Sequence, residues 1–339
     1  MSERARQRRA FAARTGWGDA AQTALAGDAS ARRYERFTRD DGSAVLMDDP
    51  PPGHCVSAFV RIADLLRSMG YSAPRILDVD EALGFALLED LGDDSFSALL
   101  AGPDASSLER TLYDAAIDFL IDLRGRSVPP DLPHYDPAWM LSDATLFLET
   151  AIDDAVEPAM AAEFQAAWRE PLEEAIRGPA VLCLRDFHAG NLMWLPARGD
   201  GGCNSAGFGR VGLLDFQDAR LGPAAYDLVS LLQDARRDVD SALENRLLNH
   251  YCIEVAKSEA SFDEQVFRTM YAIMGAQRNT KILGIFARLA ARDGKKSYLA
   301  HIPRVARYLQ RNLAAAELAN LRNWFETHLP EMGSGELIV

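Results

Sequence analysis

The stretch that decides the fold is Leu184-Arg185-Asp186-Phe187-His188-Ala189-Gly190-Asn191, together with a second Asp-Phe stretch, Asp215-Phe216-Gln217-Asp218. In the first stretch, Asp186 is followed five positions later by Asn191. In the second, Asp215 ends a short apolar run. Carboxylate and amide oxygens suit Mg²⁺, and a carboxylate can also take the proton of an attacking hydroxyl. The two stretches therefore predict phosphoryl transfer, with Asp186 as the base and Asn191 and Asp215 as metal ligands.

Short apolar runs flank these residues. Residues 181–184 and 191–195 are expected to be strands that enter and leave the loop, and residues 211–214 a third strand that delivers Asp215. The segment 196–210 is rich in Gly, Asp and Asn, which is typical of an exposed hairpin tip. Singly, each polar residue could cap a turn or end a strand. Their combination favours the catalytic interpretation.

Composition narrows the possible partners. The chain has 339 residues, and its 48% apolar and 25% charged content is that of an ordinary globular protein with room for two lobes. A net charge of -14 argues against a general binder of nucleic acid or anionic membranes. The four cysteines are widely spaced, which favours a reducing cytoplasm over a disulfide framework or zinc site. No apolar run approaches the ~20 residues of a membrane span.

The first fifteen residues carry five arginines but no apolar core, so they do not resemble a secretory signal. A transit peptide is the alternative, but Glu3 and Asp19 interrupt the acid-poor pattern that it requires. We expect an amphipathic helix whose Phe11 and Trp17 pack on the body of the protein.

Short strands and one helix follow. Strands are expected around residues 26–49, with 44–47 as a clear example, and at 74–79 and 85–88, and a helix at 56–69. The loop Gly27–Tyr34 has small residues and two arginines, so its backbone and guanidinium groups could meet phosphates. A surface hairpin with solvated arginines is the alternative. The candidate phosphate-binding residues are Asp28, Ser30, Arg32 and Arg33.

Residues 89–93 are polar and follow an apolar strand, so we expect a hinge whose backbone at Glu89 and Leu91 meets an adenine edge. A plain turn is the alternative. The remainder is predicted to be mostly helical, with helices at 106–123, 139–152, 159–176, 221–232, 241–254, 261–292 and 297–327. The predicted fold is α+β and bilobal: a small antiparallel sheet with a helix at 1–88, a hinge at 89–93, and a helical lobe at 94–339.

Two histidines and one aspartate complete the candidate site. His134 lies in a Pro-rich loop that could form a wall for the substrate, although a surface role is the simpler interpretation. His188 lies inside the catalytic loop and could contact the substrate or only pack there. Asp227 lies in the apolar first turn of a helix, where a charged group needs a partner. In kinase-like folds an Asp at this place accepts hydrogen bonds from the catalytic-loop backbone, so Asp227 is predicted to be a structural brace.

The order GDASARRY, MDDPPP, GFALLEDLG, RDFHAGN, LLDFQDARLGPAAYDLVSLL and QRNTKILGIFARL resembles the aminoglycoside phosphotransferase and choline kinase-like superfamily. Within it, the chain is most similar to bacterial N-acetylmuramate/N-acetylglucosamine anomeric kinases of cell-wall recycling. The resemblance runs from about Ala26 to about Leu289. It implies a protein-kinase-like bilobal enzyme that uses ATP and Mg²⁺ to phosphorylate a small molecule, perhaps the anomeric hydroxyl of an amino sugar.

Three departures from the superfamily pattern leave alternatives open. Residues 139–150 do not match the sugar-binding segment of the sugar-kinase subgroup, which leaves the substrate open. Leu184 stands where the catalytic loop usually begins with His, and Met47 stands where a lysine usually pairs the phosphates. Arg32 or Arg33 would then supply the positive charge. An aminoglycoside, choline, homoserine or ketosamine kinase on the same fold is one alternative, and a catalytically silent nucleotide-binding protein is another.

Overall fold

The computed structural model describes residues 2–25, 32–51, 55–150, 156–196 and 207–330. The chain divides into two compact units, each built from separate stretches of sequence. The first unit holds residues 1–119 and 189–219, and the second holds residues 120–188 and 220–339. The lobe boundary expected at residue 88 divides the chain in another way and stays a prediction.

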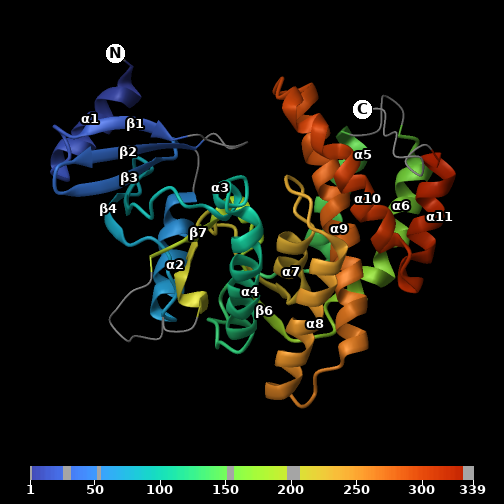
Figure 1. Cartoon of the computed structure of the whole chain (residues 1–339). Coiled ribbons are helices and arrows are strands. Elements are labelled where there is room, and N and C mark those ends of the chain that lie inside the picture. Colours follow the sequence, from blue (N-terminus) through green and yellow to red (C-terminus); the bar gives the residue numbers. More distant parts are fainter. Residues whose placement is uncertain (1, 26–31, 52–54, 151–155, 197–206, 331–339) are drawn as a thin grey trace. The chain divides into compact units, whose positions relative to one another are not determined.

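A five-stranded sheet forms the N-terminal part of the first unit (Figure 1). Its order is β1-β2-β3-β5-β4, and every neighbouring pair is antiparallel. Because β3 pairs with β5 from Ala44↔Glu89 to Asp48↔Phe85, the polar segment after Glu89 leaves from an inner strand of the sheet. The strands are β1 (Ala21–Leu25), β2 (Arg33–Arg39), β3 (Gly42–Asp48), β4 (Ile76–Asp80) and β5 (Phe85–Glu89).

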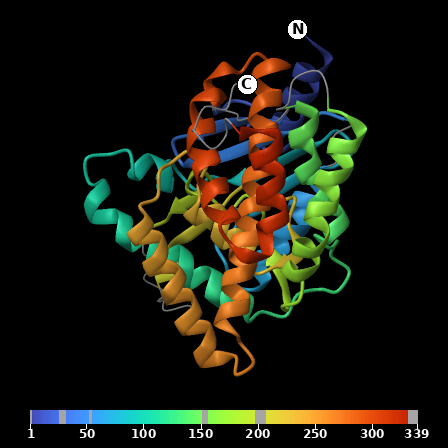
Figure 2. The same ribbon diagram turned by 90° about the vertical axis from the view of Figure 1, so that its right-hand side faces the viewer.

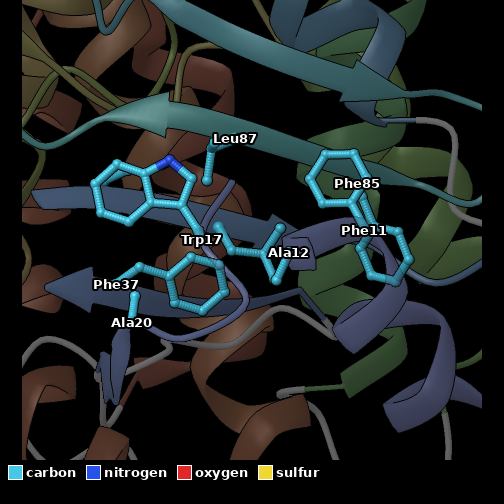
Figure 3. Packing of buried hydrophobic residues seen from close by; sticks show 9 residues of the cluster. Phe11, Ala12, Trp17, Ala20, Phe37, Phe85 and Leu87 are labelled. Atoms are coloured by element: carbon cyan, nitrogen blue, oxygen red, sulfur yellow. The ribbon is translucent and has the colours of Figure 1, made fainter. Parts of the chain in front are cut away.

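The N-terminal helix α1 (Glu3–Arg14) packs on one face of this sheet. The ring centroids of Phe11 and Phe85 lie 5.3 Å apart, and those of Trp17 and Phe37 lie 6.4 Å apart (Figure 3). Large aromatic side chains dominate the burial of apolar area in such a cluster. The expectation that Phe11 and Trp17 pack on the body of the protein is confirmed, but the helix ends at Arg14, so Trp17 lies beyond it.

Further elements of the first unit carry the second catalytic stretch. Helix α2 (Cys55–Ser68) contributes Phe59, whose ring stacks on Phe216 at 4.7 Å between centroids. The short strands β7 (Leu192–Trp194) and β8 (Val211–Leu213) pair antiparallel as a hairpin, as predicted. The other elements of this part of the chain are α3 (Phe96–Leu99), the longer helix α4 (Ala105–Arg124), and the 3-10 turns η1 (Ala189–Asn191) and η3 (Gly207–Arg210).

The second unit is mostly helical and is organised on α9 (Glu264–Ala291). Helix α9 packs against α5, α7 and α10, and α11 packs against α6. Figure 2 shows α9 to α11 in orange and red, with α5 and α6 in green. The other helices are α5 (Pro137–Thr150), α6 (Pro158–Ala175), α7 (Ala225–Leu232), α8 (Ser241–Ser258), α10 (Ile302–Leu313) and α11 (Ala319–His328).

Two predicted helix boundaries in this unit are wrong. The helix expected from residue 221 begins only at Ala225, because residues 220–223 form strand β9 (Arg220–Pro223), which pairs with β6 (Ala180–Cys183). The helix expected over 297–327 is instead η4 (Lys296–His301), α10, η5 (Ala316–Leu318) and α11. Nothing local ends α10, since Gly and Pro are missing there. Packing of the fully buried Leu318 and Leu321 overrides the helical pattern.

Among the described residues, no helix combines the length and apolar character that crossing a membrane requires.

Gly84 closes the β4–β5 turn with a φ of +71°, and an added Cβ would lie 2.0 Å from the backbone oxygen of Asp49. Gly70 has a φ of +90°, but nothing lies within 4 Å of its added Cβ. We expect Gly84→Ala to lower the free energy of unfolding by about 2–5 kcal/mol, since it adds a steric clash to left-handed strain. The matched control Gly70→Ala should lower it by about 1–2 kcal/mol. Equal losses in urea unfolding would contradict the clash.

Candidate active site

The catalytic loop begins where β6 ends, in the second unit. Asp227 on α7 accepts hydrogen bonds from two of its backbone N–H groups, that of Leu184 at 2.6 Å and that of Arg185 at 2.8 Å. Arg185 has a φ of +71°, which is strained for a residue with a side chain. The Oγ of Ser230, one turn further along α7, donates to the Arg185 carbonyl at 3.2 Å. The backbone is therefore held on both sides of its strained residue.

Asp227 is 3% exposed, and burial raises its pKa to about 7 although both N–H donors favour the carboxylate. A buried carboxyl with two backbone donors is a satisfied polar group rather than an exposed acid. Its position matches the structural brace expected from the sequence, while its effect on activity stays a prediction.

Leu184 is 3% exposed, so the residue that replaces the usual His is part of the core.

The two reactive candidates of the loop differ in their surroundings. Asp186 is partly exposed and therefore accessible to a substrate hydroxyl. His188 is 7% exposed, and its backbone N–H donates to the Asp186 carbonyl at 3.1 Å. Burial lowers the pKa of His188, so the imidazole is neutral at neutral pH. A neutral, buried ring suits a packing or hydrogen-bonding role better than that of a fixed cation.

A partly buried charge cluster binds the Arg185 side chain of the loop, and sequence analysis missed it. Asp143 on α5 accepts hydrogen bonds from the Tyr135 hydroxyl (2.8 Å), an Arg185 Nη (2.9 Å) and the Lys281 Nζ (2.8 Å). The Arg185 guanidinium also lies over the Tyr135 ring, 4.8 Å from its centroid. Burial opposes the charge of Arg185, but Tyr226, Tyr135, Asp143 and Asp186 raise its pKa above its ordinary value.

Asp143 is thus a partly buried anchor for Arg185 and Lys281. The sequence predicts that Asp143 lies on a helix, but it does not predict the partners of this carboxylate, because they lie 8, 42 and 138 residues away.

His134 is exposed and lies apart from the loop's own hydrogen bonds. The segment that carries it pairs with β9: the Tyr135 N–H donates to the Leu221 carbonyl at 2.7 Å, and the Leu221 N–H donates to the Pro133 carbonyl at 2.9 Å. His134 lines a small cavity with Gly222 and Pro223. These contacts fit a structural segment, and a substrate role for His134 stays a prediction.

The first unit holds the expected metal ligands. The β7–β8 hairpin brings Asn191 and Asp215 to one end, where the Leu214 N–H donates to the Asn191 carbonyl at 3.0 Å. Asp215 has a φ of +57°. Its carboxylate pairs with Arg32 at 2.9 Å and accepts from the Gln217 Nε2 at 3.1 Å.

Asn191 and Asp215 both line a cavity of about 270 Å³. Two hard oxygen ligands fit Mg²⁺, which keeps waters and phosphate oxygens in its remaining positions. Among the described residues, no group of three or more His, Cys, Asp or Glu forms a metal cluster. The donor set is therefore typical of a metal shared with a nucleotide rather than of a closed protein site.

The same cavity brings the predicted hinge and phosphate residues together. Glu89 and Leu91 line it beside apolar side chains from the sheet and α2, including Leu25, Val45, Phe59 and Leu88. An apolar slot with a few polar groups at one end is the usual form of a nucleotide site. Arg32 lines the cavity, whereas Arg33 is an exposed residue that opens β2. Asp28 and Ser30 lie outside the described residues.

Met47 is fully buried, so the usual lysine position belongs to the core. Asp48 beside it binds Arg4 at 2.5 Å. Arg32 is thus the candidate cation that faces Asp215. Burial raises the pKa of Tyr34, which lies next to Arg32, to about 12, so its phenol stays protonated.

Residues 21–264 match a family model described as the phosphotransferase enzyme family. The N-acetylmuramate/N-acetylglucosamine kinase of Caulobacter vibrioides is 38% identical over 97% of this chain and 98% of its own length. The kinase of the same name from Neisseria meningitidis serogroup B is 35% identical over 88% of each chain.

Solved structures share the fold at low identity. A choline/ethanolamine kinase family protein from Mesorhizobium loti superposes with a TM-score of 0.60 and 16% identity over 96% of this chain and 99% of its own. The ADP-bound aminoglycoside phosphotransferase APH(2'')-Ib gives a TM-score of 0.58 and 13% identity over 88% and 96%. The expected α+β, kinase-like fold is confirmed.

Replacing Asp143 with Ala would leave Arg185 and Lys281 without their shared carboxylate. We expect the free energy of unfolding to fall by about 2–4 kcal/mol, slightly less than for a fully buried pair because 19% of the Asp143 side chain is exposed. The control Asp122→Ala removes a surface pair with Arg126 and should change it by less than about 1 kcal/mol. Urea unfolding compares them, and a loss at Asp143 no larger than that at Asp122 would argue against the anchor.

Proposed function

The chain belongs to the phosphotransferase enzyme family, and from this premise we propose that it transfers the γ-phosphoryl group of ATP to the anomeric hydroxyl of an N-acetylated amino sugar. N-acetylmuramate and N-acetylglucosamine are the proposed acceptors. The observation that carries the acceptor is the 32–38% identity to four kinases named for these two sugars, over 88–97% of the chain.

The carboxylate and amide set supports an active enzyme. Asp186 would accept the proton of the acceptor hydroxyl while that oxygen bonds to the γ-phosphorus and the bond to the β-phosphate breaks. Asn191 and Asp215 would hold Mg²⁺, which when bound neutralises the charge that develops on the transferred group. Asp227 would act through Leu184 and Arg185, because it fixes the backbone that positions Asp186.

The cavity of the first unit supports nucleotide binding. The backbone of Glu89 and Leu91 would meet the adenine edge, and the apolar side chains beside them would cover its faces. Arg32 would bind phosphate oxygens in place of the missing lysine, and the loop that contains Asp28 and Ser30 would cover them. We also propose that the enzyme works in the cytoplasm on a small molecule, with residues 1–88 and 94–339 as its lobes and 89–93 as its hinge.

A test of the function is ATP consumption with Mg²⁺ against N-acetylmuramate, N-acetylglucosamine, aminoglycosides, choline, homoserine and ketosamines. We expect turnover on the N-acetylated sugars, its loss on chelation, and its return with Mg²⁺. Asp186→Ala should lower kcat by about 10²–10⁴-fold, because general-base catalysis is lost. Its melting temperature should match that of the wild type.

Three results would decide against parts of this proposal. Turnover only on an aminoglycoside or choline would show that the acceptor is that compound and not an N-acetylated amino sugar. ATP binding without turnover on any acceptor would favour a silent nucleotide-binding protein. Undiminished turnover by Asp186→Ala would remove that residue from the role of base.

The neighbours Arg32 and Arg33 offer a matched pair for the phosphate contact. Arg32→Ala should weaken ATP binding about 10- to 100-fold, the range expected for loss of a hydrogen bond to a charged group. Arg33→Ala should leave it within about twofold, because a solvated surface charge contributes little. Calorimetric titration with ATP compares the two variants, and a larger effect at Arg33 would reverse the assignment.

A further inference from the structure

Helix α9 carries an unusual polar run, Gln277-Arg278-Asn279-Thr280-Lys281, in its middle. The first four residues are at most 5% exposed. Buried polar groups need partners, and four of the five residues have them within the second unit. Their bonds are from Gln277 Nε2 to the Met140 carbonyl (2.9 Å), Asn279 Nδ2 to Gln233 Oε1 (2.8 Å), Thr280 Oγ1 to the Ala276 carbonyl (2.8 Å), and Lys281 Nζ to Asp143 (2.8 Å).

Arg278 differs from the other four, although the Gln277 Oε1 and Asn279 Oδ1 atoms also lack a partner among the described residues. The Arg278 side chain is 5% exposed, and within the described part of the chain it makes no hydrogen bond and no ion pair. Its Nη1 is enclosed without any acceptor. An unpaired buried guanidinium is costly, and arginine cannot escape that cost by losing its proton. An anion that pairs with this guanidinium would remove that cost.

The surroundings of Arg278 belong to the catalytic loop. Helix α9 packs against α7, which carries Asp227. The Arg278 charge acts on both His188 and Asp227, and the Asp186 carboxylate acts on the same two groups. The hydrogen bonds of the residues next to Arg278 lead to the same region. Asn279 binds Gln233, which follows α7, and Lys281 binds Asp143, which also binds Arg185 next to the proposed base.

Two acidic groups of this region, Asp227 and Asp234, already have donors. Both oxygens of Asp227 accept backbone N–H groups, and the Oδ1 of the buried Asp234 accepts the Arg236 N–H at 2.8 Å. A ligand anion would give Arg278 the partner that these two carboxylates do not supply. A guanidinium presents paired N–H donors that match a carboxylate.

We propose that Arg278 binds the carboxylate of N-acetylmuramate and so determines how the enzyme distinguishes the acidic amino sugar from the neutral one. This inference rests on the proposed function. N-acetylmuramate carries a lactyl carboxylate that N-acetylglucosamine lacks, and the two sugars share the anomeric hydroxyl. A cation that binds this carboxylate would change the selectivity between the two sugars without changing the reacting hydroxyl.

The test compares kcat/KM for the two sugars in the wild type, Arg278→Met and a control, Arg268→Met. Arg268 lies on the same helix but pairs with Glu264 at the surface. Arg278→Met should lower kcat/KM for N-acetylmuramate about 10- to 100-fold and leave the value for N-acetylglucosamine within about threefold. Arg268→Met should leave kcat/KM unchanged for both sugars. Arg278→Lys should fall between, since it keeps the charge but loses the paired donors.

A second readout does not depend on turnover. Without ligand, Arg278→Met should melt at a higher temperature than the wild type, because a buried unpaired charge is replaced by an apolar chain. N-acetylmuramate should raise the melting temperature of the wild type but not that of Arg278→Met.

Each contrary result overturns the proposal. Equal losses on both sugars would assign Arg278 to the shared reacting centre. An unchanged ratio would remove it from selectivity, while turnover of either sugar by the wild type would leave the proposed function standing. An Arg278→Met variant that melts lower or fails to fold would assign Arg278 a structural role. If the wild type turns over neither sugar, the proposed function and this inference fail together.

Discussion

The hydrogen bonds from the Leu184 and Arg185 N–H groups to Asp227 are the constraint on which the rest of the second unit's site depends. They hold a residue with positive φ in a loop whose backbone polar groups would otherwise be buried without partners. With Arg185 fixed, its side chain reaches Asp143 on α5, and Asp143 in turn binds Lys281 on α9. One carboxyl on α7 thus links a strand end, the loop of Asp186 and the helices α5 and α9.

The strongest sequence predictions came from residues whose role depends on local order along the chain. The hairpin around Asn191 and Asp215, the strand before Glu89 and the aromatic anchors of α1 all follow from short patterns of apolar and polar residues. Strand β9 could not be found in this way, because Arg220–Pro223 contains Gly and Pro and resembles a helix start.

The missed residues share a physical cause. The hydrogen-bond partners of Asp143 lie far from it along the chain. Arg278 is notable for the opposite reason, because its buried Nη1 has no partner among the described residues. Sequence periodicity says that a residue faces inward but not whether a buried charge has a partner. The break between α10 and α11 has a similar origin, since the buried Leu318 decides it rather than a local breaker.

The replacement of the usual lysine by the buried Met47 changes how the cavity of the first unit would react with chemical probes. The basic side chains among the described residues that line this cavity are Arg32 and Arg36. Nucleotide analogues that label a protein by acylating an amine would find no target among them. Dicarbonyl reagents, which attack guanidinium groups, would find Arg32.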